Sequence, residues 1–381
     1  MNAAKPPPLS TCNRPPRSDL PLKTVRDKRP RSPAPPSGRI ICQRTDGLGG
    51  RLLILLWTLR FARSVDASLL MFWPKLDLFS YNDSGAGDLF DLYRLSSPPF
   101  RNRLQIVDGD CRTYIAWSPI RLNRRKTYDP AAFVVPVDIK HWRQALPVIV
   151  GHWEGPFLAP GERAAEVMAD MPALFGTLPF RRDLMAEVDR VAQERGLSEV
   201  VAVHVRRGEI VQNLRAAVAG YRPEDPEGQG VLHDRVGTFA RRCMSVDNFA
   251  AALRKFVDEG RTILVFSDEP HVHEELGRAL GTPDVLAAAS LVTGQFTGLQ
   301  QAFVELCLMS RCLCIVGARS AYSLSANVIG ANARVDLNLR SRTAADCAAL
   351  ALSSAAAELQ AHPHRAQIEQ RIQDEIARLH G

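Results

Sequence analysis

An apolar stretch with a strand-like pattern runs directly into two arginines. Residues 201–209 read VAVHVRRGE. Because successive side chains of a strand point to opposite faces, His204 and Arg206 share one face and Arg207 lies on the other. Arginine carries a permanent charge on a planar fork that can donate to two phosphate oxygens at once. These residues predict an anion site at the strand end. An arginine pair bound to surface carboxylates is the alternative interpretation.

The diphosphate of a nucleotide sugar is the anion that this chemistry suits. In glycosyl transfer the leaving diphosphate gains charge as the bond between sugar and oxygen breaks, and a metal or donors such as Arg206 must neutralise it. Glu209 and Asp46 are candidate general bases, because a carboxylate near the site can deprotonate an acceptor hydroxyl. Glu209 also suits a smaller role, which is to orient Arg206.

A glycine-rich loop follows the first β-rich run of the chain. Residues 38–44 read GRIICQR, and residues 46–51 read DGLGGR. Gly47 and Gly49 allow the backbone to approach a ligand, and the start of the following helix favours an anion. The loop lacks the full GxGxxG spacing. A tight turn from strand to helix is therefore an equal alternative.

Two later loops add polar groups at strand ends. Asp268 lies in SDE after the apolar run ILVF, where a carboxylate can accept from a base or a ribose hydroxyl, or can merely cap the next helix. Arg319, Ser320 and Tyr322 lie in GARSAYS, between an apolar run and a helix. Hydroxyls and N–H groups at a helix N-terminus suit phosphate.

The elements that position these loops alternate along the chain. Residues 38–74 read as strand, glycine loop, helix and strand, and residues 183–338 alternate helix and strand patterns. Gly196 and Gly260 are expected to end helices, and Ser245 or Asp247 to cap one. Such alternation indicates parallel sheets with helices on both faces. The predicted fold class is α/β, with two Rossmann-like domains facing a cleft and ligands beyond the carboxyl ends of the strands.

The domain organisation follows from composition and pattern. Residues 1–37 hold 10 of the 26 prolines and most of the net charge of +7, and predict a disordered, basic, proline-rich tail. Residues 38–175 are expected to form an N-terminal Rossmann-like domain on the acceptor side, and residues 176–345 the nucleotide-sugar domain. C-terminal helices are expected over 346–381, with Ile368, Ile372, Ile376 and Leu379 on one docking face.

The remaining sequence features limit which partners and which cellular location are expected. The chain beyond residue 37 is nearly neutral, so no nucleic-acid partner is expected, although the tail leaves open a basic arm that touches membrane or nucleic acid. No apolar run is long enough to span a membrane, and no secretory signal is recognisable. The eight cysteines lack zinc-ligand spacing and are expected to be free, buried thiols in the cytoplasm of a bacterium.

The ordered set of loops resembles a known family. HVRRGE is similar to the HxRRxD signature of the GDP-fucose-dependent α-1,2-, α-1,6- and protein O-fucosyltransferases. The order DGLGGR, HVR, FSDE, AFVELCLMSRC, IVGARSAYS and ARVDL resembles most closely the rhizobial NodZ-like α-1,6-fucosyltransferases, over residues 40–340. The resemblance implies a GT-B-like fold and inverting, metal-independent transfer of fucose from GDP-fucose to a glycan hydroxyl, without a cofactor.

The resemblance also implies roles for single residues. Arg206 would clamp the diphosphate, His204 would lie near the nucleotide and Asp268 near the guanosine half. Ser320 and Tyr322 would lie near the phosphates. The remaining donor-binding candidates are Arg207, Gly47, Gly49 and Arg319.

Three departures from the family pattern leave alternatives open. Glu209 stands where Asp or Asn is usual, and Gly50 where many relatives carry Asn. An arginine expected at the start of the last helix is missing, and Arg319 is a candidate substitute. Two alternatives remain. One is an enzyme of the same fold that uses another nucleotide sugar, and the other is a catalytically degenerate protein that only binds glycan or nucleotide. The acceptor and the oligomeric state are not readable from the sequence.

Overall fold

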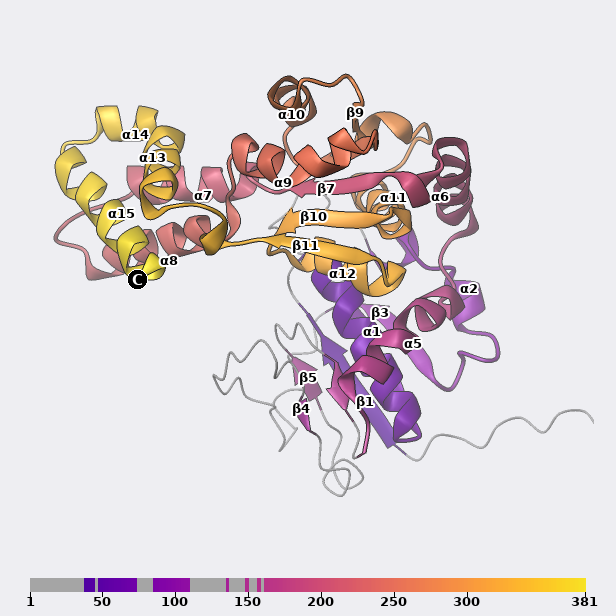
Figure 1. Ribbon diagram of the computed structural model, residues 1–381. Coiled ribbons are helices and arrows are strands. Elements are labelled where there is room, and N and C mark those ends of the chain that lie inside the picture. Colours follow the sequence, from indigo (N-terminus) through magenta and orange to yellow (C-terminus); the bar gives the residue numbers. More distant parts are fainter. Residues whose placement is uncertain are drawn as a thin grey trace, which may run out of the picture. The chain divides into compact units, whose positions relative to one another are not determined.

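The computed structural model describes residues 38–44, 47–73, 85–109, 135–136, 148–150, 156–158 and 161–381. From residue 36 onward the chain is one compact unit, whose described part holds two larger parallel sheets and their helices (Figure 1). The expected tail at 1–37 and the general-base candidate Asp46 lie outside the described residues. The predicted domain limits are not tested by this unit and stay a prediction.

The first sheet begins with the predicted strand–helix–strand unit. Helix α1 is buried along almost its whole length because its sequence, LGGRLLILLWTLRFARS, is apolar on nearly every side. The four strands are parallel in the order β3-β2-β1-β5. The elements are β1 (Gly38–Gln43), α1 (Leu48–Ser64), β2 (Ala67–Trp73), β3 (Leu104–Asp108) and β5 (Val148–Val150).

Shorter elements complete this part of the chain. A two-stranded parallel sheet pairs β4 with β6, and Phe90 bridges to Phe180. The bounds are η1 (Ala86–Asp88), α2 (Leu92–Leu95), β4 (Val135–Pro136), β6 (Phe157–Leu158) and α5 (Ala164–Thr177).

The second sheet has the strand order of a Rossmann fold. Its five parallel strands lie in the order β11-β10-β7-β8-β9. The chain moves outward from β7 to β9 and then returns to β10 on the other side of β7, so the topological switch point lies between β7 and β10. The strands are β7 (Val201–Val205), β8 (Ile263–Ser267), β9 (Val285–Ala287), β10 (Cys314–Ala318) and β11 (Ala333–Leu337). The predicted GT-B-like class, α/β with two Rossmann-like sheets, is confirmed.

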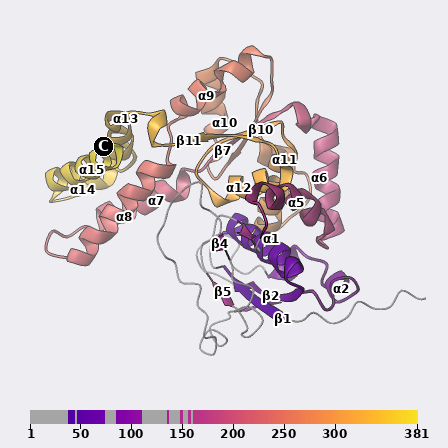
Figure 2. The same cartoon turned by 60° about the horizontal axis from the view of Figure 1, so that its bottom comes forward.

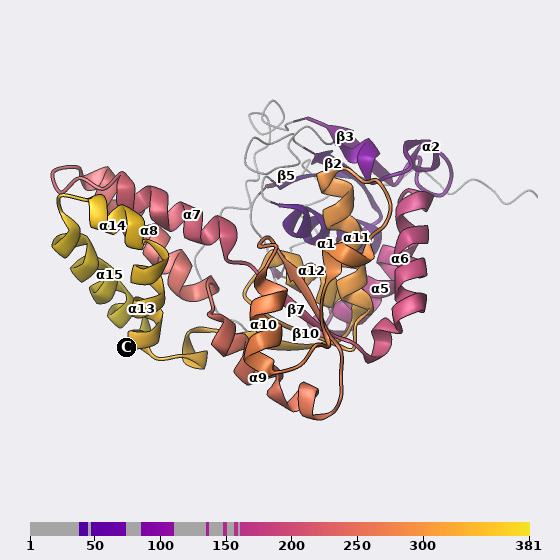
Figure 3. The same cartoon turned by 90° about the horizontal axis from the view of Figure 1, so that it is seen from above.

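Helices cover both faces of the second sheet, as the alternation predicted. Alternate residues of β7 enter two different cores: Ala202 joins the core shared with α1, and Val203 the core on the other face. Figure 3 shows α9 and α10 on one side of the sheet and α11 and α12 on the other. The helices are α6 (Arg182–Arg195), α9 (Val246–Asp258), α10 (Val272–Leu280), α11 (Gly298–Arg311) and α12 (Ala321–Gly330), with the turns η2 (Leu197–Glu199) and η3 (Ala288–Leu291).

The predicted helix ends are confirmed. Gly196 follows α6 with a φ of 57°, and Gly260 follows α9 with a φ of 71°, in the left-handed region that glycine tolerates. Ser245 caps α9, because its side chain accepts from the N–H of Asn248.

A separate group of helices forms a third core beside the second sheet. The C-terminal helices pack on two helices inserted between β7 and β8 (Figure 2). Ile368, Ile372 and Ile376 are fully buried, and Leu379 is partly buried against the same core, so the predicted docking face is confirmed. The group contains α7 (Gly208–Ala219), α8 (Pro226–Arg242), α13 (Ala344–Ser354), α14 (Ala356–Ala361) and α15 (Arg365–His380); the turn η4 (Leu339–Ser341) precedes α13.

The cysteines of the described residues are free thiols inside the protein. Burial raises the pKa of Cys243 and of Cys312 to about 12, which keeps these thiols protonated at neutral pH. Cys42, Cys243, Cys307, Cys312, Cys314 and Cys347 are free and buried, as predicted. Cys12 and Cys111 lie outside the described residues. Among the helices that the structure describes, none is long and apolar enough to cross a membrane.

The start of α1 packs directly against the start of α12. A Cβ atom on Gly49 would lie 2.4 Å from the Cα of Tyr322 and 2.7 Å from the carbonyl oxygen of Ala321. The hydroxyl of Ser325 lies 2.5 Å from the carbonyl oxygen of Gly49. The glycine is therefore needed for helix packing, and this contact joins the first sheet to the second.

We expect Gly49→Ala to destabilise the protein by about 1–3 kcal/mol, because a new methyl group would overlap backbone atoms of α12. Gly230→Ala is the control, since Gly230 is a helical glycine in α8 with nothing within 4 Å of an added Cβ. The control should raise stability by about 0.5–1 kcal/mol. Urea unfolding of both variants measures the difference. A neutral Gly49→Ala variant would contradict the observed packing.

Candidate functional site

Several of the predicted site residues lie at the switch point of the second sheet. His204 on β7 pairs in register with Gly317 on β10, which pairs with Asp336 on β11. A Cβ atom on Gly317 would lie 3.4 Å from the Cβ of His204 and 3.8 Å from the hydroxyl of Ser323. His204 is 7% exposed, and the centre of its ring lies 5.3 Å from that of Tyr322, at the start of α12.

Burial and two cations keep the imidazole neutral. Burial, together with the charges of Arg206 and Arg334, lowers the pKa of His204 to about 3. A neutral imidazole adds no positive charge to the site and retains one nitrogen that can accept a hydrogen bond.

Arg206 is paired with a neighbour that a ligand could replace. Its guanidinium donates to the carboxylate of Glu209, in the first turn of α7. The Arg206 side chain is 27% exposed and that of Glu209 is 43% exposed. An ion pair at this exposure is weak, so an anion of higher charge can compete for the guanidinium.

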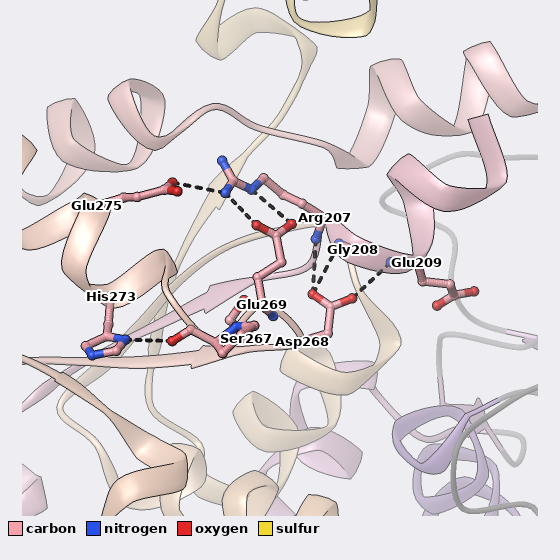
Figure 4. Close-up of polar contacts among 9 residues, drawn as sticks. Arg207, Gly208, Glu209, Ser267, Asp268, Glu269, His273 and Glu275 are labelled. Atoms are coloured by element: carbon pink, nitrogen blue, oxygen red, sulfur yellow. Dashed lines mark hydrogen bonds and ion pairs between the residues drawn. The ribbon is translucent and has the colours of Figure 1, made fainter. Parts of the chain in front are cut away.

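Arg207 has a different environment from Arg206. Its Nη2 lies 2.6 Å from Glu269 and 3.3 Å from Glu275, and 14% of its side chain is exposed (Figure 4). Burial alone would lower the pKa of Arg207, but the two carboxylates raise it. For this residue the structure favours the alternative interpretation, an arginine held by carboxylates.

Asp268 lies against the start of α7. Its carboxylate accepts from the backbone N–H groups of Arg207, Gly208 and Glu209 at 3.1–3.3 Å (Figure 4). A Cβ atom on Gly208 would lie only 3.0 Å from Oδ2 of Asp268. The carboxylate therefore caps a helix, as the sequence allowed, but the helix is α7 rather than the one that follows β8.

The start of α12 forms the other side of the switch point. Ser320 is 4% exposed, and its hydroxyl accepts from the N–H of Tyr322 at 3.2 Å. The hydroxyl of Tyr322 donates to the carbonyl oxygen of Ala302 at 2.5 Å. Arg319 is exposed just before the helix. The N–H of Tyr322 is therefore already satisfied within the protein, and Gly49 packs against the same helix start.

The structure thus gathers part of the predicted set. His204, Arg206, Ser320 and Tyr322 lie at the ends of β7 and β10, and Gly49 reaches them through its contact with Tyr322. Gly47 is the N-cap of α1. Arg207 and Asp268 stabilise the loop between β7 and α7, and Asp46 lies outside the described residues.

Arg334 on β11 influences His204 through its charge and was not predicted. Its Nε donates to Asp336 at 2.6 Å, its side chain is 11% exposed, and its Nη1 is buried without a hydrogen-bond partner. In the sequence, ARVDL puts Arg334 and Asp336 on one face of a strand. This alternation of charges was the sequence signal from which Arg334 could have been predicted. Among the residues that the structure describes, no group of His, Cys, Asp and Glu is arranged to hold a metal ion.

Comparison with known proteins gives distant structural likenesses only. No protein-family model and no curated protein matches the sequence. The crystal structure of apo POFUT1 is similar at 14% identity and a TM-score of 0.41, over 79% of this chain and 98% of that one. The crystal structure of the fucosyltransferase NodZ from Bradyrhizobium is similar at 14% identity and a TM-score of 0.43, over 80% of this chain and 96% of that one. NodZ α-1,6-fucosyltransferase soaked with GDP-fucose gives the same values. Such distant likenesses assign no activity to this chain.

The neutral state of His204 predicts a pH dependence of stability. The unfolded chain binds a proton at this residue below about pH 6.5, whereas the folded protein does so only near pH 3. Stability should therefore fall as the pH drops through this window, by at most about 1.4 kcal/mol per pH unit.

Urea unfolding from pH 7 to pH 4 measures this slope. His204→Gln should remove that part of the slope, whereas His271→Gln, at an exposed position, should keep it. Equal slopes for the wild type and His204→Gln would show that the imidazole binds a proton as readily in the folded protein as in the unfolded chain.

Proposed function

We propose that the protein is a glycosyltransferase that binds a nucleotide sugar at the switch point between β7 and β10. The specific reaction is inverting, metal-independent transfer of fucose from GDP-fucose to a glycan hydroxyl. The observation that carries the proposal is the half-buried guanidinium of Arg206. It lies beyond β7 next to a buried neutral imidazole, and among the described residues its ion-pair partner is the partly exposed carboxylate of Glu209.

The position of Arg206 supports an anionic ligand. Ligands of open α/β sheets bind outside the carboxyl ends of the strands at a switch point. At this switch point the start of α12 supplies backbone N–H groups and the positive end of a helix dipole. A diphosphate between Arg206 and α12 would meet donors on two sides.

Each of these groups has a role in the proposed transfer reaction. An acceptor oxygen attacks the anomeric carbon, the bond from that carbon to the diphosphate oxygen breaks, and the electron pair remains on the diphosphate. Arg206 and the N–H groups of α12 stabilise that developing charge. The acceptor proton passes to a carboxylate, for which Glu209 and Asp46 are the candidates.

The donor assignment rests on the sequence motifs. GDP-fucose is implied by the order of the loops around HVRRGE, not by a described base pocket. Gly50 and the missing arginine near Ser323 are departures, so a different nucleotide sugar is the second candidate. We also propose that residues 38–175 contribute the acceptor side, that residues 176–345 bind the donor, and that the enzyme acts in the cytoplasm.

We expect GDP to bind with micromolar affinity in calorimetric titrations, with or without magnesium, and more tightly than UDP. Arg206→Ala should weaken GDP binding by at least tenfold, because a charged donor to a phosphate contributes about 1.5–3 kcal/mol. Arg278→Ala, at an exposed position on α10, is the matched control and should bind as the wild type does. Preference for UDP would move the assignment to another nucleotide sugar. An unchanged affinity of Arg206→Ala for GDP would contradict the proposed diphosphate site at Arg206.

Glu209→Gln separates two roles of this carboxylate. The variant should bind GDP at least as tightly as the wild type, because the internal competitor for Arg206 has lost its charge. If Glu209 is the base, transfer should fall by about 10²-fold or more. Single-turnover assays with GDP-fucose and a glycan panel measure this, with Asp46→Asn in parallel. Weaker GDP binding in Glu209→Gln would contradict competition between Glu209 and the diphosphate.

A further inference from the structure

The turn after β8 holds the loop that carries Arg206. Asp268 Oδ1 accepts from the N–H groups of Arg207 and Gly208 at 3.3 Å each, and Oδ2 accepts from Glu209 at 3.1 Å. These N–H groups belong to the N-cap and first turn of α7, where a helix offers no acceptor of its own. One carboxylate therefore satisfies three donors and lies at the positive end of the helix dipole.

The loop between β7 and α7 also holds the turn after β8. Arg207 from the first loop donates to Glu269 of the second, with Nη2 at 2.6 Å and Nε at 3.3 Å. The hydroxyl of Ser267 accepts from the N–H of Glu269 at 3.0 Å, and His273 Nδ1 lies 3.0 Å from the carbonyl oxygen of Pro270 (Figure 4). The turn that presents Asp268 is thus itself braced.

We propose that Asp268 is a positioning residue for Arg206: it holds the loop between β7 and α7 in the conformation that presents the guanidinium to the diphosphate. The consequence for ligand binding rests on the proposed function, whereas the loop contact does not. Gly208 belongs to this contact, since its missing side chain lets the carboxylate approach the backbone. This role replaces a direct contact between Asp268 and the guanosine half.

Amide hydrogen exchange tests the loop contact without any ligand. In the full-length wild type, peptides that cover residues 205–210 should exchange slowly at the amides of residues 207–209. Asp268→Ala should make these amides exchange fast, and Asp268→Asn should have a smaller effect because its amide oxygen can still accept. Asp284→Asn, at an exposed position before β9, is the control. Fast exchange already in the wild type would overturn the proposal.

Titration with GDP and with guanosine tests the link to Arg206. Asp268→Ala should bind GDP about tenfold more weakly, which corresponds to roughly 1.4 kcal/mol, and should bind guanosine as the wild type does. In an Arg206→Ala background the same substitution should change GDP affinity little, because the two residues act through one contact. A role that is independent of Arg206 would instead add to the effect of Arg206→Ala on GDP affinity.

The outcomes separate the two proposals. A parallel loss of guanosine affinity in Asp268→Ala would show direct contact with the nucleoside and overturn the positioning role. If the wild type binds neither GDP nor UDP, the proposed function fails, and the exchange rates still decide whether Asp268 holds the loop. If GDP binds the wild type, Asp268→Ala and Asp268→Asn with equal affinity, the contact between the two loops does not position Arg206 for the diphosphate.

Discussion

Positive charge is concentrated at the carboxyl end of β7, and the rest of the site depends on how that charge is balanced. Half-buried cations this close together are costly unless each has its own anion. The structure gives each group a separate local partner, so no single carboxylate neutralises the whole site. The partners are Arg206 with Glu209, Arg207 with Glu269 and Glu275, Arg334 with Asp336, and the start of α7 with Asp268.

Under the proposed function, this balance leaves two neutral groups beside the ligand. His204 stays neutral because it is buried between Arg206 and Arg334, so it adds no charge that would need a further anion. The start of α12 is capped by the neutral hydroxyl of Ser320. Gly49 packs against that same helix start and thereby brings the glycine-rich turn of the first sheet to the edge where Arg206 lies. The two Rossmann-like sheets thus meet at the site.

Much of the fold was readable from local pattern, whereas the pairing of charges was not. Alternating apolar runs predicted β7 and β10, and Gly196 and Ser245 marked helix ends, because these signals lie within a few residues of one another. The partners of Arg207 lie more than 60 residues away, in the turn after β8 and on α10. Periodicity holds no information about such contacts. The helix α8 was missed because its glycines and polar residues weaken the helical pattern, and Arg334 was missed because its role depends on the neighbouring strands.

This arrangement explains why residue 209 can be a glutamate, which is one methylene longer than an aspartate. An aspartate there would be well suited to the start of α7, but Asp268 already satisfies those N–H groups from the neighbouring loop. Residue 209 is therefore released from capping, and a glutamate can fold back over one helical turn to reach Arg206. Under the proposed function, a diphosphate with its higher charge displaces this carboxylate from the guanidinium. The displaced Glu209 then lies beside the reacting bond with its proton-accepting oxygens free.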